Sequence, residues 1–167
     1  RMSVDIDLFT DAIYGSVNFD VIDDSFLRSF KYVELGFGGN NSLGKIYYLG
    51  YNKADAVKVD LFYTDPFVFP MIDYQGLRLS RMEEIAAMKL AVIGHSGRKK
   101  DFWDLHELME HYTLSEMIGF YEKRYPYGYS KVEIIKKLTS FGEADSDFEP
   151  ICLRNKHWEL IKLDFED

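Results

Sequence analysis

The chain has 167 residues, which suits one domain or two small lobes. Apolar residues make up 47% and aromatic residues 16%, enough to form a hydrophobic core. The formal net charge of −8 argues against broad, non-specific nucleic-acid binding, although it is compatible with a local basic pocket for one phosphate group.

The cysteine count and the hydropathy pattern bear on the compartment. Cys152 is the single cysteine, so an internal disulfide is excluded and a reducing compartment fits. No apolar run approaches the roughly 18 residues that a membrane span needs, and the N-terminus has a charged strand pattern in place of a signal peptide. We therefore expect a cytoplasmic protein that does not contact a membrane.

Because the chain begins inside a predicted strand with Arg1, we also expect a fragment or processed form of a longer protein.

The first half of the chain is predicted to consist mainly of strands. A short helix with helical spacing of apolar residues is expected over residues 20–30. Residues 38–42 and 52–55 have turn compositions, and such short turns indicate antiparallel hairpins. A linker or edge segment is expected over residues 65–71. The predicted strands are residues 3–9, 31–37, 44–51, 56–63 and a short last one at 76–80.

The second half is predicted to be helical. Its helices are expected at residues 81–93, 99–112, 114–124 and 131–141. Three capping boxes support these starts, at Ser80–Glu83, Thr113–Glu116 and Ser130–Glu133, and Gly94 suits the end of the first helix. An acidic loop is expected over residues 142–150, and residues 157–165 fit a strand or a short helix.

The order of these elements predicts an α+β fold. A small, mostly antiparallel or mixed sheet over residues 1–79 is followed by a helical region over residues 80–167.

Three carboxylates interrupt the strand pattern. Asp5 and Asp7 share one face of the first strand, and Asp60 lies on the corresponding face of a later strand. If these two strands are neighbours, the three carboxylates form an oxygen-rich site of the kind that binds Mg²⁺, which organises phosphoryl and nucleotidyl transfer. The alternative is the solvated face of an antiparallel sheet.

Two charged residues lie on apolar helix faces. The apolar stripe of residues 81–93 contains Met82, Ile85 and Leu90, with Glu83, Glu84, Ala87 and Ala91 opposite, and Lys89 falls near the centre of the stripe. Lys89 must therefore extend to solvent or meet an anion. Asp101 lies within the apolar arc of the next helix, and Asp104 lies on its flank. Asp101 is either a first-turn acid favoured by the helix dipole or a partner for a group such as Lys89.

Other segments carry weaker signals. Arg98, Lys99 and Lys100 form a basic loop at a helix N-terminus, which is either a phosphate contact or a solvated charged loop. His106 and His111 lie five residues apart, about 140° around a helix, so we do not expect a zinc site.

Taken in order, several of these segments resemble the AbiEii/AbiGii-type nucleotidyltransferase toxins. The segments are "RMSVDIDLF", "VKVDLF", "LRLSRMEEIAAMKLAVI" and "GRKKDFWDLHELM", with the strongest likeness in "DIDLF", "IAAMKL" and "KKDFWDL". The resemblance covers most of the chain. It implies a polymerase-β-like nucleotidyltransferase core with a helical C-terminal region.

The resemblance also implies an activity. Members of this family use a nucleoside triphosphate and Mg²⁺ to transfer a nucleotide, some of them to the acceptor end of tRNA. Many are toxins with a separately encoded antitoxin in phage-defence systems. The expected function is therefore transfer from a nucleoside triphosphate to an RNA, such as the 3′ end of tRNA, or to a protein acceptor.

The resemblance assigns roles to individual residues of this sequence. Asp5 and Asp7 match the metal-binding pair, and Asp60 matches the later acidic position. Lys89 is implied to contact the triphosphate, and Asp101 matches the last acidic motif, with Asp104 a weaker candidate. Apart from the resemblance, we expect Ser3, Arg98, Lys99 and Lys100 to contact the nucleotide.

One part of the family pattern is absent from this sequence. A Gly-Gly or Gly-Ser turn that cradles phosphates is expected roughly ten residues before the carboxylate pair, which would place it before Arg1. The alternative function is therefore a catalytically inactive binding module with a nucleotidyltransferase fold.

Overall fold

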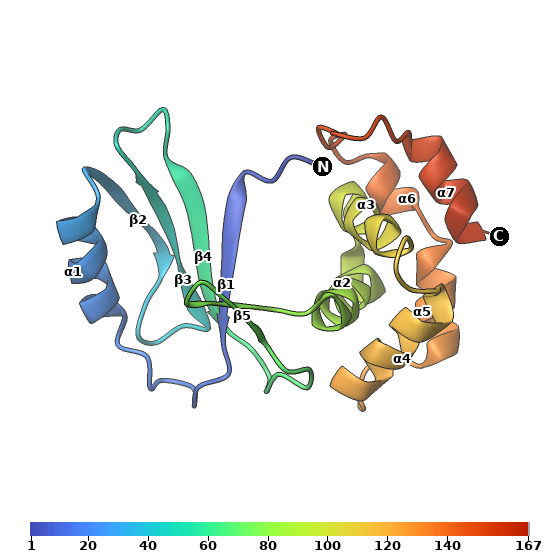
Figure 1. Cartoon of the computed structure of the whole chain (residues 1–167), viewed down its shortest axis with the longest axis horizontal. Coiled ribbons are helices and arrows are strands. Elements are labelled where there is room, and N and C mark those ends of the chain that lie inside the picture. Colours follow the sequence, from blue (N-terminus) through green and yellow to red (C-terminus); the bar gives the residue numbers. More distant parts are fainter. Residues whose placement is uncertain (167) are drawn as a thin grey trace. The chain divides into compact units, whose positions relative to one another are not determined.

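The computed structural model describes residues 1–166, and the chain divides into two compact units (Figure 1). One unit is Ser3–Pro66, and the other is Arg1–Met2 with Phe67–Asp167. The sequence pattern predicts a boundary between the sheet region and the helical region at residues 79 and 80. The compact units instead divide at Pro66, so the last predicted strand belongs with the helices.

The smaller unit is built on a mixed sheet with the strand order β1-β4-β3-β2. β1 pairs with β4 in parallel, whereas β4 with β3 and β3 with β2 pair antiparallel. The expected hairpins are therefore confirmed, and the mixed character comes from the β1–β4 pair. The strands are β1 (Asp5–Thr10), β2 (Tyr32–Gly38), β3 (Gly44–Gly50) and β4 (Val57–Tyr63).

Helix α1 (Phe19–Ser29) lies against one face of this sheet (Figure 1). The Asn18 side chain caps the helix by accepting hydrogen bonds from the backbone N–H groups of Asp20 and Val21. Four buried side chains form the core of this unit: Phe19, Tyr47, Leu49 and Val59. Because Val59 points into this core, its neighbours Lys58 and Asp60 point to the other face of the sheet.

The β2–β3 turn depends on Gly38. Its φ of +112° is unfavourable for other residues, and a Cβ there would lie 2.0 Å from the Gly44 carbonyl oxygen. A register shift between Leu35 and Gly38 accompanies this turn.

The larger unit contains one two-stranded hairpin and the remaining helices, which confirms the α+β class. Helix α2 packs against α3, α4 and α5. Two alternatives were open for residues 157–165, and all of them except His157 lie in a helix, which begins at Trp158. The elements are β5 (Ile72–Tyr74), β6 (Leu77–Leu79), α2 (Met82–Ser96), α3 (Lys99–Leu108), α4 (Leu114–Arg124), α5 (Lys131–Leu138), α6 (Gly142–Asp145) and α7 (Trp158–Glu166).

Two of the three predicted capping boxes are confirmed. The Thr113 and Ser130 side chains each accept a hydrogen bond from the N–H three residues later, and Glu116 and Glu133 reach back to the cap N–H groups. The Ser80 prediction was wrong, because α2 begins after Arg81 and has no side-chain cap.

Several predicted helix ends were also wrong. Helix α2 runs through Gly94 to Ser96, because Gly94 serves packing: a Cβ there would lie 2.8 Å from the Tyr129 ring. The helices expected to end at residues 112 and 141 end at Leu108 and Leu138. The acidic segment 142–150 contains the short helix α6.

The predicted polar face of α2 was wrong for two residues. Ala87 is fully buried, and Glu84 is 1% exposed because it forms a buried ion pair with Arg124 of α4. Glu84 also accepts hydrogen bonds from the backbone N–H groups of Val68 and Phe69. A helix enclosed by three others is buried on more than one face, which a single apolar stripe does not describe. Among residues 1–166, no helix is long and apolar enough to cross a membrane.

Candidate active site

The sheet brings the three predicted carboxylates to one face. Because β1 and β4 are parallel neighbours, Asp7 pairs in register with Asp60, and Asp5 pairs with Lys58. Partners in register share a face, on strands about 4.8 Å apart. Three carboxylates and the Lys58 ammonium therefore share the face opposite α1.

Asp60 has one oxygen occupied and one without a partner. The Lys58 Nζ atom lies 2.5 Å from Asp60 Oδ2. The hydrogen bond from Lys58 to Asp60 raises the pKa of Lys58 and outweighs the opposing effect of burial. The other oxygen, Asp60 Oδ1, is buried and has no hydrogen-bond partner. Such an oxygen is costly unless it meets a ligand, a cation or a proton donor.

Ser3 lies beside the same carboxylates. Its hydroxyl donates hydrogen bonds to the side chain of Asp5, at 3.0 Å, and to the Asp5 backbone carbonyl, at 3.3 Å. This contact orients the Asp5 carboxylate. The predicted contact of Ser3 with a nucleotide stays a prediction.

The donor set suits a hard cation, but it is not a closed cage. Carboxylate oxygens are the ligands that Mg²⁺ prefers. No group of three or more His, Cys, Asp or Glu side chains within residues 1–166 is arranged to hold a metal ion. Mg²⁺ in nucleotide enzymes is commonly held by one or two carboxylates together with substrate phosphates, so the pair Asp7 and Asp60 fits that kind of binding.

Lys89 and Asp101, the candidates from the larger unit, pair with each other. Lys89 Nζ lies 2.8 Å from Asp101 Oδ1 and 2.8 Å from Asp104 Oδ2. Asp101 is 3% exposed, and its second oxygen accepts a hydrogen bond from the Arg98 backbone N–H at the start of α3. The sequence left open whether Lys89 extends to solvent or meets an anion, and it meets two carboxylates. Asp101 lies in the first turn of α3 and also pairs with Lys89, so both of its predicted roles are observed.

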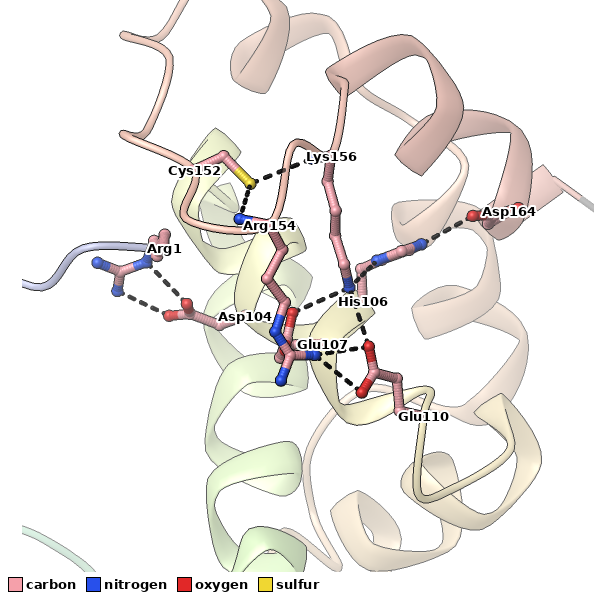
Figure 2. Close-up of polar contacts among 9 residues, drawn as sticks. All are labelled: Arg1, Asp104, His106, Glu107, Glu110, Cys152, Arg154, Lys156 and Asp164. Carbon is pink, nitrogen blue, oxygen red and sulfur yellow. Dashed lines mark hydrogen bonds and ion pairs between the residues drawn. The ribbon is translucent and has the colours of Figure 1, made fainter.

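Arg1 completes this helical charge cluster, which we define as Arg1, Lys89, Asp101 and Asp104. Figure 2 shows the Arg1 guanidinium facing the Asp104 carboxylate, with two hydrogen bonds of 2.7 and 2.8 Å. Sequence reasoning missed Arg1, because the first residue of a chain has no periodic context. Asp104, a flanking candidate in the sequence, is the residue that joins both cations.

The cluster shifts the pKa values of its members in opposite directions. Burial acts to raise the pKa of Asp104, but hydrogen bonds from Arg1 and the charge of Lys89 outweigh it and lower that pKa. Burial acts to lower the pKa of Lys89, but Asp101 and Asp104 outweigh it and raise that pKa. Both shifts favour the charged forms of Lys89 and Asp104.

The basic loop does not act as one group. Arg98 contacts Asp147 through two hydrogen bonds of 3.0 and 3.2 Å. Lys99 is buried, with its ammonium 5.5 Å from the centre of the Trp158 ring, and Lys100 is partly buried. The Arg98 guanidinium and the Lys99 ammonium thus lie beside different groups, Asp147 and Trp158, and the predicted role of these residues toward phosphate stays a prediction.

The histidine of α3 is held by protein groups on both ring nitrogens. His106 Nε2 lies 2.7 Å from Asp164, and Nδ1 lies 3.0 Å from the Lys156 ammonium (Figure 2). Lys156 also contacts Glu107, at 2.9 Å. Both ring nitrogens of His106 are thus engaged by protein side chains.

The amino-acid sequence matches the model of one protein family over most of its length. The family model described as the nucleotidyl transferase AbiEii toxin of a type IV toxin–antitoxin system matches residues 1–158. The chain belongs to this family. Membership supports a nucleotidyltransferase toxin and suggests an antitoxin partner. No curated protein matches the chain.

Proposed function

We propose that this AbiEii-family chain transfers a nucleotide from a nucleoside triphosphate to a hydroxyl of an RNA or protein acceptor, with Mg²⁺ as cofactor. The observation that carries the proposal is the register of β1 and β4, which pairs Asp7 with Asp60 on one face with Asp5. The buried oxygen Asp60 Oδ1 without a hydrogen-bond partner supports a ligand at that position.

Two carboxylates would hold the metal together with phosphate oxygens of the substrate, with Asp5 and Asp7 as the pair that the family pattern implies. Asp60 has one available oxygen, which would either coordinate the metal or act on the acceptor hydroxyl. When bound, Mg²⁺ neutralises charge on the triphosphate and aligns it for displacement. Ser3 orients the Asp5 carboxylate through its 3.0 Å hydrogen bond. Lys58 limits Asp60 to one available oxygen.

Asp60 Oδ1 is also suited to accept a proton from the acceptor. In this step, the acceptor hydroxyl oxygen forms a bond to the α-phosphorus and its proton moves to Asp60 Oδ1. The bond between the α-phosphorus and the bridging oxygen breaks, and pyrophosphate leaves. Proton transfer to a positioned carboxylate contributes roughly 10²–10⁴-fold to such a reaction.

Lys89 would contact the triphosphate, as the family pattern implies. Its ammonium is held by Asp101 and Asp104, so it is fixed in place and remains charged. The proposed substrates and partners are a nucleoside triphosphate, an acceptor such as the 3′ end of tRNA, and a cognate antitoxin protein, in a phage-defence setting in the cytoplasm.

The test is transfer of label from an α-labelled nucleoside triphosphate to tRNA or protein, with Mg²⁺ present. We expect labelling by the unchanged protein and loss of labelling in Asp7→Ala. Asp24→Ala is the matched control, because Asp24 is an exposed carboxylate on α1, which covers the opposite face of the sheet. Equal labelling by Asp7→Ala and the unchanged protein would contradict the assignment, and an inactive binding module predicts no labelling by any variant.

A further inference from the structure

A cavity of about 550 Å³ lies in the larger unit, where α3, α6 and α7 meet. Its lining includes Lys99 and Trp158, the first residues of α3 and α7, and Asp145, the last residue of α6. This volume is within the range of roughly 300–1,000 Å³ that small-molecule sites occupy. None of its lining residues belongs to the sheet carboxylates or to the helical charge cluster.

Lys99 is the unusual member of this lining. It is 7% exposed, and within residues 1–166 its ammonium makes no hydrogen bond and no ion pair. Its ammonium lies 5.5 Å from the centre of the Trp158 ring, and the Asp145 carboxylate acts on it electrostatically without an ion pair. A buried ammonium is costly without an anion, and a cation in the first turn of a helix also opposes the helix dipole. Both costs would be relieved by an anionic group bound in the cavity.

The other lysine of the cavity already has partners. Lys162 Nζ lies 3.1 Å from Asp145 Oδ1 and 3.0 Å from Glu159 Oε2. Asp145 also accepts a 2.6 Å hydrogen bond from the Trp158 indole N–H. This part of the wall is therefore fixed by internal contacts, and Lys99 is the cation available to a ligand.

The carboxylates of the cavity restrict what the anion can be. Glu149 lines the cavity, is exposed, and has no hydrogen bond or ion pair to residues 1–166. Together with Asp145 and Glu159, it would repel a phosphate dianion or a nucleic-acid backbone. A ligand that suits both Lys99 and Glu149 carries one carboxylate and one ammonium group.

We propose that this cavity binds a free α-amino acid, with its carboxylate on Lys99 and its ammonium on Glu149. Lys162 is shared by two carboxylates, which leaves an excess of negative charge on the wall, so a basic side chain is favoured. The proposal does not depend on nucleotidyl transfer, because none of its residues takes part in that proposed step.

The experiment is a titration of the full chain with L-lysine, followed by the indole N–H resonance of Trp158 in two-dimensional NMR. Because that N–H donates to Asp145 at the cavity wall, binding should shift its resonance in a saturable way. Trp103→Phe assigns the resonance, since the chain has two tryptophans. We expect the shift of the Trp158 resonance to saturate at about 10 mM L-lysine, because this concentration exceeds a dissociation constant of about 1 mM, which is typical of a weak site.

Two variants and one analogue decide the outcome. Lys99→Met should weaken binding roughly tenfold or more, the change expected from losing a charged hydrogen bond. Lys53→Met, in the exposed turn before β4, should leave it unchanged. L-lysinamide, which lacks the carboxylate, should bind as weakly to the unchanged protein as L-lysine binds to Lys99→Met. No saturable shift with L-lysine, equal binding by Lys99→Met, or equal binding of L-lysinamide would each overturn the proposal.

Discussion

The two charged clusters of this protein differ in how their charges balance. On the sheet, the carboxylates of Asp5, Asp7 and Asp60 share a face of β1 and β4 with one ammonium, that of Lys58. In the larger unit, Asp101 and Asp104 face two cations, Lys89 and Arg1, through short contacts.

The difference lies in the satisfaction of one carboxylate oxygen. On the sheet, the buried oxygen Asp60 Oδ1 has no hydrogen-bond partner, whereas Asp101 and Asp104 each contact a cation. The helical charge cluster is neutral overall, and its pKa shifts stabilise its charged forms. We therefore expect substitutions on the sheet to change activity more than stability, and substitutions in the helical charge cluster to change stability as well.

The largest expected effect is on the rate of nucleotide transfer. Asp60→Asn keeps the shape of the side chain but removes its ability to accept a proton, so the rate should fall roughly 10²–10⁴-fold. The measurement is initial-rate labelling with thermal unfolding as a parallel record of folding. A rate within twofold of the unchanged protein would remove Asp60 from the proposed step.

The next effect is on stability in the larger unit. Asp101→Asn should lower the free energy of unfolding by about 1–3 kcal/mol, because Lys89 and the Arg98 N–H lose a charged acceptor in a buried place. Urea titration measures this change. Asp24→Asn, an exposed helical position, serves as the control and should change the free energy by less than about 0.5 kcal/mol.

The free energy of unfolding should depend on pH through the helical charge cluster. The folded-state pKa of Asp104 is below its unfolded value, so its contribution to stability is present above the unfolded pKa of about 3.9. That contribution should be lost as the pH falls from about 4 through the lower folded pKa. In Asp104→Asn, unfolding titrations should show a smaller loss of stability over this acidic range than the unchanged protein. A loss of the same size would contradict the role of Asp104.

The smallest effect concerns repulsion on the sheet. Asp5→Asn removes one of three carboxylates on neighbouring strands, but it also removes the attraction between Asp5 and Lys58, its partner in register. These opposing changes, together with loss of the Ser3 hydrogen bond to Asp5, should leave the free energy of unfolding within about 0.5 kcal/mol of the unchanged protein in the absence of metal. Urea titration in chelator measures it, and a clear decrease in stability would show that Asp5 is already compensated.

Much of the fold follows from local patterns in the sequence. Alternating residues located the strands, and the turns between them fixed the hairpins. Short-range capping at Thr113 and Ser130 located two helix starts. Helix ends were harder, because the reason for Gly94 is a tertiary contact with Tyr129 that leaves no local signal.

The site was predictable to the extent that its residues interrupt a pattern. Asp5, Asp7 and Asp60 alternate with apolar residues, and Asp101 stands out on an apolar helix face. Arg1 could not be found in this way, and Glu84 was placed on the solvent side because its partner Arg124 is forty residues away in the sequence. Partners that meet only after folding are invisible to periodicity.

The central claim is that the sheet carboxylates bind a nucleoside triphosphate through Mg²⁺, and that Asp104 of the helical charge cluster is not needed for this binding. Calorimetric titration of a nucleoside triphosphate in the presence and absence of Mg²⁺ tests it most directly, with the unchanged protein, Asp7→Asn and Asp104→Asn compared. We predict Mg²⁺-dependent binding by the unchanged protein and Asp104→Asn, and loss of that binding in Asp7→Asn. Equal binding by all three proteins, or binding that does not depend on Mg²⁺, would contradict the claim.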